Sequence, residues 1–146
     1  MGLIQLNKRL ISFLLIIVLI FPIFTSGVYS ASSTKVNITL QSVVCVQNNH
    51  VGNEWSYGAT VNKKAIYEGQ TVEISTSPNG KITIISMAEE DDSYPDYGSK
   101  TITVSVSKLK ANANAKYTAN VTVVENRGRY SGNSAVWKFT YTVKKK

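Results

Sequence analysis

"VWKFTYTV", residues 136–143, is the stretch that decides the fold, because its side chains alternate between two characters. Every second side chain is large and apolar or aromatic: Trp137, Phe139, Tyr141 and Val143. The residues between them are mostly polar. Successive side chains of a β-strand point to opposite faces, so this period of two predicts a strand with one face in a core and the other in water.

The same alternation recurs along the chain, at residues 35–41, 55–62, 71–75 and 101–107. Three further runs are apolar on both parities and predict central strands or strands with a bulge: residues 43–46, 82–88 and 121–124. Helix evidence is poor. Seven or eight strands separated by turns predict an all-β fold, a single Greek-key antiparallel β-sandwich of the C2-like or immunoglobulin-like kind.

Turn chemistry supports the division into strands. "SPNG" at residues 77–80 is the clearest signal, because Asn79 and Gly80 accept the positive φ angles of a hairpin turn. "VNKKA" at residues 61–65 marks a shorter turn. The sequence therefore predicts a hairpin around Asn79-Gly80.

The N-terminal residues have the pattern of a signal peptide. Lys8 and Arg9 precede an almost wholly apolar stretch, residues 10–24, and small residues follow it. This predicts cleavage near Ser30-Ala31, which divides the chain into a signal peptide, 1–30, and a secreted β-sandwich domain, 31–146. The alternative is an uncleaved membrane anchor, since a short span and a signal sequence overlap in length.

Charge and cysteine content bound the environment. The chain carries a formal net charge of +7, and removal of Lys8 and Arg9 with the leader lowers it to +5. A modest positive excess suits association with an anionic wall, membrane or polysaccharide. Cys45 is the only cysteine, so the exported domain has no intrachain disulfide, which favours a bacterial origin.

An acidic stretch interrupts the basic chain: "AEEDDSYPDYGSK", residues 88–100. Crowded carboxylates repel one another, and a hard cation that prefers oxygen ligands would relieve the repulsion. Asp91, Asp92 and Asp96 are therefore candidate Ca²⁺ ligands. The alternative is a solvated loop, in which the two glutamates before Asp91 alternate in and out at a strand end and pair with lysine or arginine.

The segment Asp91–Gly98, "DDSYPDYG", together with the polar stretch "NNHVGNEW" at residues 48–55, resembles the loops of a C2-like domain. The resemblance implies a β-sandwich whose loops gather Ca²⁺ at one end, with Asp91, Asp92 and Asp96 as ligands. It also implies that this end docks on lipid or another surface. The first loop departs from the family pattern, since it carries asparagines and a glutamate where calcium-binding members carry aspartates.

Residues 48–54 contain the only histidine of the chain and form a second candidate site. His50, Asn53 and Glu54 offer polar groups to a ligand. The alternative is a loop histidine that bonds to backbone or pairs with Glu54. One histidine and one cysteine do not supply the three or four ligands that a zinc site uses.

The loop at residues 126–134 is the third candidate. Arg127 and Arg129 could bind a carboxylate or phosphate, and Tyr130 offers an aromatic surface beside them. The alternative is that either arginine neutralises Glu125 or the acidic loop. Both interpretations stay open at this level.

Together these features predict a small secreted, non-catalytic binding module at the bacterial cell envelope or extracellular surface, with Ca²⁺ as its candidate cofactor. Contact with a membrane surface is compatible with the charge, whereas nucleic acid is a poor partner for an exported chain with a large acidic cluster. The alternatives are an antimicrobial or toxin-like effector that acts on another cell's envelope and a secreted hydrolase. No G-x-S-x-G, H-E-x-x-H or phosphate-loop motif occurs.

Overall fold

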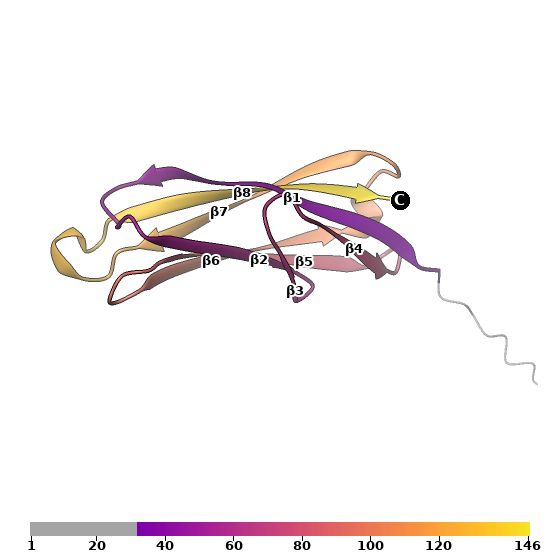
Figure 1. Cartoon of the computed structure of the whole chain (residues 1–146). Coiled ribbons are helices and arrows are strands. Elements are labelled where there is room, and N and C mark those ends of the chain that lie inside the picture. Colours follow the sequence, from indigo (N-terminus) through magenta and orange to yellow (C-terminus); the bar gives the residue numbers. More distant parts are fainter. Residues whose placement is uncertain (1–31) are drawn as a thin grey trace, which may run out of the picture. The chain divides into compact units, whose positions relative to one another are not determined.

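The computed structural model describes residues 32–146, which form a domain built almost entirely of β-strands (Figure 1). The strands are β1 (Thr34–Asn48), β2 (Trp55–Val61), β3 (Lys64–Ile66), β4 (Thr71–Thr76), β5 (Lys81–Glu90), β6 (Asp96–Ser105), β7 (Asn114–Val124) and β8 (Ser134–Lys145). Two short 3₁₀ turns accompany them, η2 (Val106–Lys108) and η3 (Gly128–Tyr130). No helix in this part of the chain is long and apolar enough to cross a membrane. The predicted signal peptide and its cleavage point lie outside the described residues.

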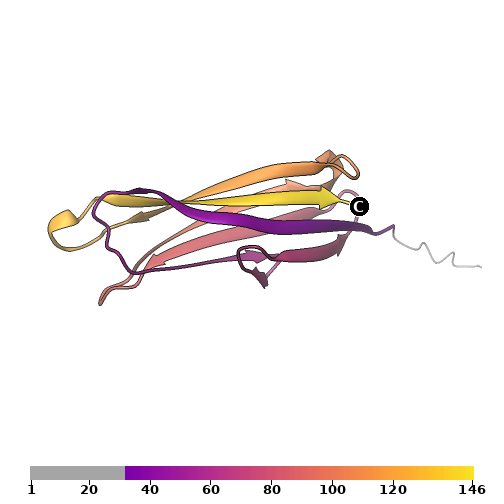
Figure 2. The ribbon, with the colours of Figure 1, turned by 45° about the horizontal axis from the view of Figure 1, so that its top comes forward.

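The strands form two four-stranded antiparallel sheets that lie face to face (Figures 1 and 2). Their orders are β4-β1-β8-β7 and β3-β2-β5-β6. In each sheet the central pair joins strands that are not consecutive in the sequence, β1 with β8 and β2 with β5, as in Greek-key connections. The predicted all-β sandwich is confirmed.

The core lies between the sheets and follows the predicted alternation. On β8, Phe139, Tyr141 and Val143 are fully buried and Trp137 is nearly so. Two buried hydroxyl groups in this core, those of Ser86 and Tyr141, form a hydrogen bond with each other, with Oγ and Oη 2.7 Å apart. Burying two hydroxyls without a partner would cost free energy, so this bond fixes β5 against β8 at the centre of the sandwich.

The two sheets meet along one side, where β6 and β7 are the outer strands. Gly98 on β6 faces the backbone of Thr122 on β7 so closely that a Cβ at this position would overlap the Thr122 carbonyl oxygen. Only glycine permits this approach. It brings the β5–β6 loop against the β7–β8 loop.

One turn prediction is wrong. Residues 77–80 do not form a hairpin, because β4 and β5 belong to different sheets, and neither Asn79 nor Gly80 has a positive φ. The Gly80 amide instead donates to the Ser77 carbonyl at 2.8 Å in a turn that crosses between the sheets. A two-residue hairpin turn with positive φ is found at Asn62 (46°) and Lys63 (69°), between β2 and β3.

The two ends of the sandwich differ in character. The β1–β2, β5–β6 and β7–β8 loops gather at one end, on the left in Figures 1 and 2. β1 begins and β8 finishes at the other end, where the Lys146 amide donates to the Lys35 carbonyl at 2.9 Å. The loop end is therefore free of both the start of β1 and the C-terminus.

Candidate functional site: a polar cavity at the loop end

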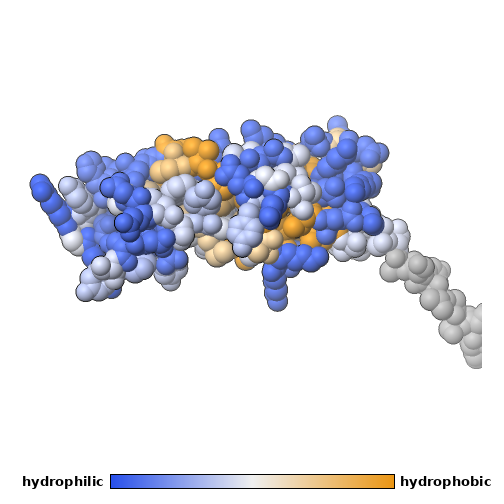
Figure 3. Space-filling view, in the orientation of Figure 1, coloured by the Kyte–Doolittle hydropathy of each residue, from blue (hydrophilic) through white to orange (hydrophobic). Residues whose placement is uncertain are grey.

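Three loops surround an open cavity of about 590 Å³ at the loop end of the sandwich. Its lining residues are Asn48, His50, Gly52, Asn53, Glu90, Asp92, Glu125 and Tyr130. Three of these side chains are carboxylates, and none is a lysine or arginine. Figure 3 shows that the surface at this end is mostly hydrophilic. The cavity is therefore a strongly acidic recess.

Glu90 is the buried member of this acidic group. It is the last residue of β5 and continues the inward-facing parity of that strand, so its side chain is only 4% exposed. Its Oε2 atom is buried and has no hydrogen-bond partner. Burying a charged oxygen without a hydrogen-bond donor costs free energy. Such atoms are rare in native folds, and a ligand that supplies the missing donor would explain this one.

The charges around Glu90 add to this cost. Burial raises the pKa of its carboxyl, and repulsion from Asp92, Glu125 and Asp96 raises it further, against an opposing effect of the Asp92 backbone amide. Within residues 32–146, both ion pairs involve Glu73, which binds Lys35 and Lys146 at the opposite end of the sandwich. No lysine or arginine of this part of the chain neutralises the recess.

Hydrogen bonds and one buried side chain hold the β1–β2 loop beside Glu90. Asn48 Oδ1 accepts a hydrogen bond from the Val51 amide at 2.9 Å, and Asn48 Nδ2 donates to the Gly52 carbonyl at 2.8 Å. Val51 is fully buried and anchors the loop to the core. Gly52, with φ +84°, lies so close to Glu90 that a Cβ there would overlap the carboxylate.

An aromatic wall closes one side of the cavity. The His50 ring lies 5.0 Å from the Tyr130 ring, centroid to centroid, with the planes inclined by 43°. His50 has a positive φ of 59° within the loop that Asn48 holds, and Tyr130 comes from η3 between β7 and β8. The wall therefore joins two loops that are distant in the sequence.

The three predicted calcium ligands do not converge. Asp91 Oδ1 accepts a hydrogen bond from Ser56 at 3.2 Å, and Asp92 Oδ1 accepts one from the Tyr94 amide at 2.6 Å. Of the predicted ligands, only Asp92 lines the cavity. In the described part of the chain, no group of three histidine, cysteine, aspartate or glutamate residues is arranged to hold a metal ion.

Asp96, the third predicted ligand, has a structural role. Its side chain is 7% exposed and accepts two hydrogen bonds from Asn126, from the amide at 3.1 Å and from Nδ2 at 2.6 Å. Both carboxylate oxygens are therefore engaged. The pair ties the start of β6 to the β7–β8 loop and holds the two loops in contact beside the cavity.

The predicted ligand-binding residues divide into two groups. His50, Asn53 and Tyr130 line the cavity, as a ligand site requires. Glu54 does not, and its carbonyl accepts a hydrogen bond from the Asp91 amide at 2.8 Å. The predicted first loop thus contributes two of its three candidates.

The two arginines stack on tyrosines and do not line the cavity. The Arg127 guanidinium lies 4.6 Å from the centre of the Tyr94 ring, and that of Arg129 lies 5.8 Å from the Tyr130 ring. Neither forms an ion pair with a carboxylate of residues 32–146, so the structure does not support the neutralisation alternative. Such cation–π contacts stabilise loop positions while leaving the carboxylates unpaired.

Glu90 and Glu125 are cavity residues that the sequence interpretation did not select. For Glu90 a signal was present: Ile82, Ile84 and Ala88 share its parity on β5, and extending the period of two places its side chain inside. For Glu125 no local signal exists. It lies just beyond β7 and reaches the cavity only because β5 and β7 occupy facing sheets.

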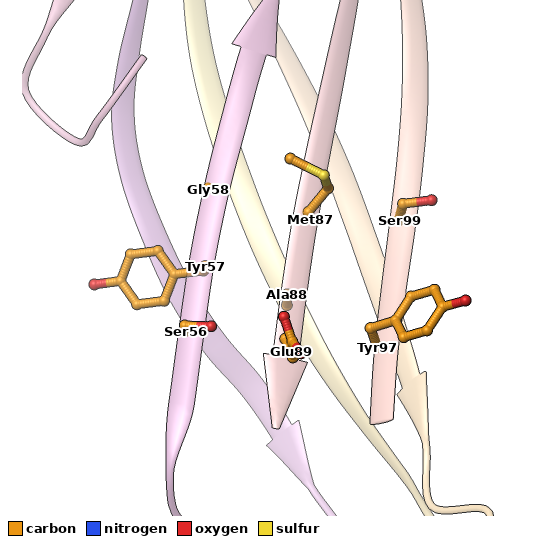
Figure 4. Close-up of a pocket in the computed structure, with 8 residues that line it drawn as sticks. All are labelled: Ser56, Tyr57, Gly58, Met87, Ala88, Glu89, Tyr97 and Ser99. Carbon is orange, nitrogen blue, oxygen red and sulfur yellow. The ribbon is translucent and has the colours of Figure 1, made fainter. Parts of the chain in front are cut away.

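A second, smaller hollow lies on β2, β5 and β6 (Figure 4). It measures about 380 Å³ and is mostly apolar, with lining residues Ser56, Tyr57, Gly58, Met87, Ala88, Glu89, Tyr97 and Ser99. The Tyr57 and Tyr97 rings point to opposite sides, and Met87 and Glu89 stand on β5 between them. Tyr97 is 80% exposed. This hollow has neither the charge nor the buried unpartnered oxygen of the cavity.

Comparison with known proteins gives no family. No protein-family model matches the sequence, and no curated protein matches it. The C2-like resemblance of Asp91–Gly98 stays a prediction, and the cavity is the feature from which a function can be inferred.

Proposed function

We propose that this protein is a secreted, non-catalytic binding module that acts at the bacterial cell envelope or another extracellular surface. The observation that carries the proposal is the cavity at the loop end, which has a buried, unpartnered carboxylate oxygen of Glu90 in its lining. Concave sites with a few convergent polar groups are the usual form of ligand pockets. The cavity opens at the end of the sandwich opposite the start of β1.

The calcium-dependent form of this proposal has weaker support. Ca²⁺ needs six to eight oxygen ligands at about 2.3–2.6 Å. Asp91 and Asp96 are engaged with Ser56 and Asn126, which leaves Asp92 as the one predicted ligand at the cavity. A binding module that uses the cavity without a metal accounts for more of the geometry.

A hydrolase is the second candidate, because one observation favours it. A buried carboxyl with a raised pKa beside other carboxylates is what a glycoside hydrolase uses as its general acid. Replacing Glu90 by Gln would abolish release of soluble sugar from a cell-wall polysaccharide if the cavity were catalytic. Retention of intact polysaccharide by the unaltered protein, with no release, supports the binding module.

The test of the proposed function is co-sedimentation of the purified protein with insoluble peptidoglycan that carries its anionic polymers, and with intact bacterial cells. Tyr130→Ala removes part of the aromatic wall and should reduce the bound fraction. Tyr67→Ala removes an exposed tyrosine that does not line the cavity and serves as the matched control. Equal sedimentation of both variants and the unaltered protein, or none at all, would contradict the proposal.

A further inference from the structure

We propose that the cavity binds an organic primary ammonium group, which donates to the buried Glu90 carboxylate beside the wall formed by His50 and Tyr130, while Asp92 and Glu125 add negative charge around it. The inference rests on the proposed function, because it names the ligand chemistry of the same site. It follows from three features of the cavity: its uncompensated charge, its buried unpartnered acceptor and its size.

The charge comes first. Three carboxylates from two segments of the chain line the recess, and in residues 32–146 none of them has an ion-pair partner. Arg127 and Arg129 lie on the same loop as Tyr130 yet stack on aromatic rings. Like charges held this close destabilise the fold unless a cation joins them. The missing partner of the cavity is therefore positive.

The buried acceptor comes second. Glu90 Oε2 has no donor, and the carboxylate lies in the space that the missing side chain of Gly52 leaves open. An ammonium group has three N–H donors and no acceptor, so it can donate to Glu90 Oε2 without adding another acceptor to the acidic recess. A guanidinium pairs with both oxygens of a carboxylate, whereas Glu90 has one buried oxygen without a partner, which a single N–H of an ammonium satisfies.

The size and the wall come third. The cavity measures about 590 Å³, and its acidic groups do not approach one another as ligands of a single metal ion would. A cation with a carbon skeleton fills such a space and keeps its charge within hydrogen-bond reach. The His50–Tyr130 pair offers an aromatic surface to that skeleton, and aromatic faces attract ligand cations.

The group could come from an alkyl amine, such as a lysine side chain, or from an amino sugar, and the two sources share one chemistry. The experiment titrates the purified protein with pentylamine, glucosamine, pentan-1-ol and CaCl₂ at low ionic strength, and follows binding by amide chemical shifts. Pentan-1-ol is the neutral match for pentylamine. Saturable binding of either amine with none of the alcohol supports the proposal, and the tighter amine identifies the source.

Glu90→Gln is the decisive variant, because it keeps the shape of the side chain and removes its charge. We expect amine affinity to fall by at least about tenfold. Glu89→Gln changes the net charge equally at the neighbouring residue, whose side chain is outside the cavity, and should leave affinity unchanged. Glu125→Gln, from a different segment of the cavity lining, repeats the test if Glu90→Gln does not fold.

Three results would overturn the proposal: no saturable amine binding, equal affinity in Glu90→Gln and Glu89→Gln, or binding of Ca²⁺ alone. Retention on cell walls with no amine binding would reject the ammonium ligand and leave the binding module standing. Loss of both would reject the module itself.

Discussion

The Glu90 carboxylate occupies the space in which a side chain at Gly52 would begin. Gly52 also has φ +84°, a conformation that L-residues other than glycine adopt at a cost. The residue therefore meets two requirements at once, because it turns the β1–β2 loop and makes room for a buried carboxylate. Each requirement can be measured separately.

Gly52→Ala is expected to destabilise the fold by more than the backbone cost of about 1 kcal/mol, because the new methyl group also displaces Glu90. Gly132→Ala is the matched control, since Gly132 has a similar φ of +93° but no atom within 4 Å of where the added methyl group would lie. Urea denaturation of both variants gives the difference in free energy of unfolding. Equal losses would show that Glu90 does not fill this space.

Glu90→Gln is expected to change how stability depends on pH. The pKa of Glu90 is raised in the fold by burial and by Asp92, Glu125 and Asp96, so the folded state holds its proton more tightly than the unfolded chain. Stability should therefore fall as pH rises from the unfolded pKa of 4.5 through the raised folded pKa. Glu90→Gln should lose this slope, which urea denaturation at a series of pH values from about 4 to about 8 would show.

Glu89→Gln controls for the change in net charge, because Glu89 is exposed on the opposite face of β5. Its curve of stability against pH should run parallel to that of the unaltered protein. A slope that persists in Glu90→Gln would mean that another group carries the titration.

The sandwich could be predicted because its evidence is local. Alternation at Trp137, Phe139 and Tyr141 reports which face of a strand is buried, and the structure confirms it. The turn at residues 77–80 shows the limit of local evidence. A short polar turn can connect strands of one sheet or of two, and the pairing that decides between them, β1 with β4, depends on residues far away in the chain.

The lining of the cavity could be predicted only in part, because sequence evidence is local. The three loops were identified from composition, and His50, Asn53 and Tyr130 do line one cavity. The role of Asp96 could not be predicted, because its partner Asn126 lies 30 residues away and no local pattern links the two. A cluster of acidic residues in the sequence shows how much charge is present, whereas the fold determines which of the carboxylates line the cavity.

The C-terminal end offers a test in the opposite pH direction. The Glu73 carboxylate forms ion pairs with Lys146 and Lys35, whose Nζ atoms each lie 2.8 Å from one of its oxygens. These ion pairs lower the pKa of Glu73 from 4.5 to about 2. Its contribution to stability is present above pH 4.5 and is lost as pH falls through about 2. Lys146→Ala should raise the Glu73 pKa toward 4.5, measured from its side-chain carboxyl resonance, with Lys145→Ala as the control.

The seam between the sheets gives a prediction about stability. Gly98→Ala is expected to destabilise the domain by about 1–3 kcal/mol, because the methyl group would force β6 away from the Thr122 carbonyl. Gly58→Ala, on β2 with nothing within 4 Å of the added methyl, should have little effect. Thermal unfolding of both variants compares them, and equal melting temperatures would show that β6 can shift without cost.

Calcium gives the last test, because the C2-like resemblance and the geometry make opposite predictions. A ligand present at about 100 times its Kd raises the free energy of unfolding by about 2.7 kcal/mol. Since Asp91, Asp92 and Asp96 have separate partners, we expect millimolar CaCl₂ to leave the melting temperature where EDTA leaves it. A calcium-dependent rise that Asp92→Asn abolishes, and that Glu68→Gln on the distant β3–β4 connection preserves, would mean that the loops rearrange around the ion. The cavity would then be a metal site, and the proposal that it binds an ammonium group would be rejected.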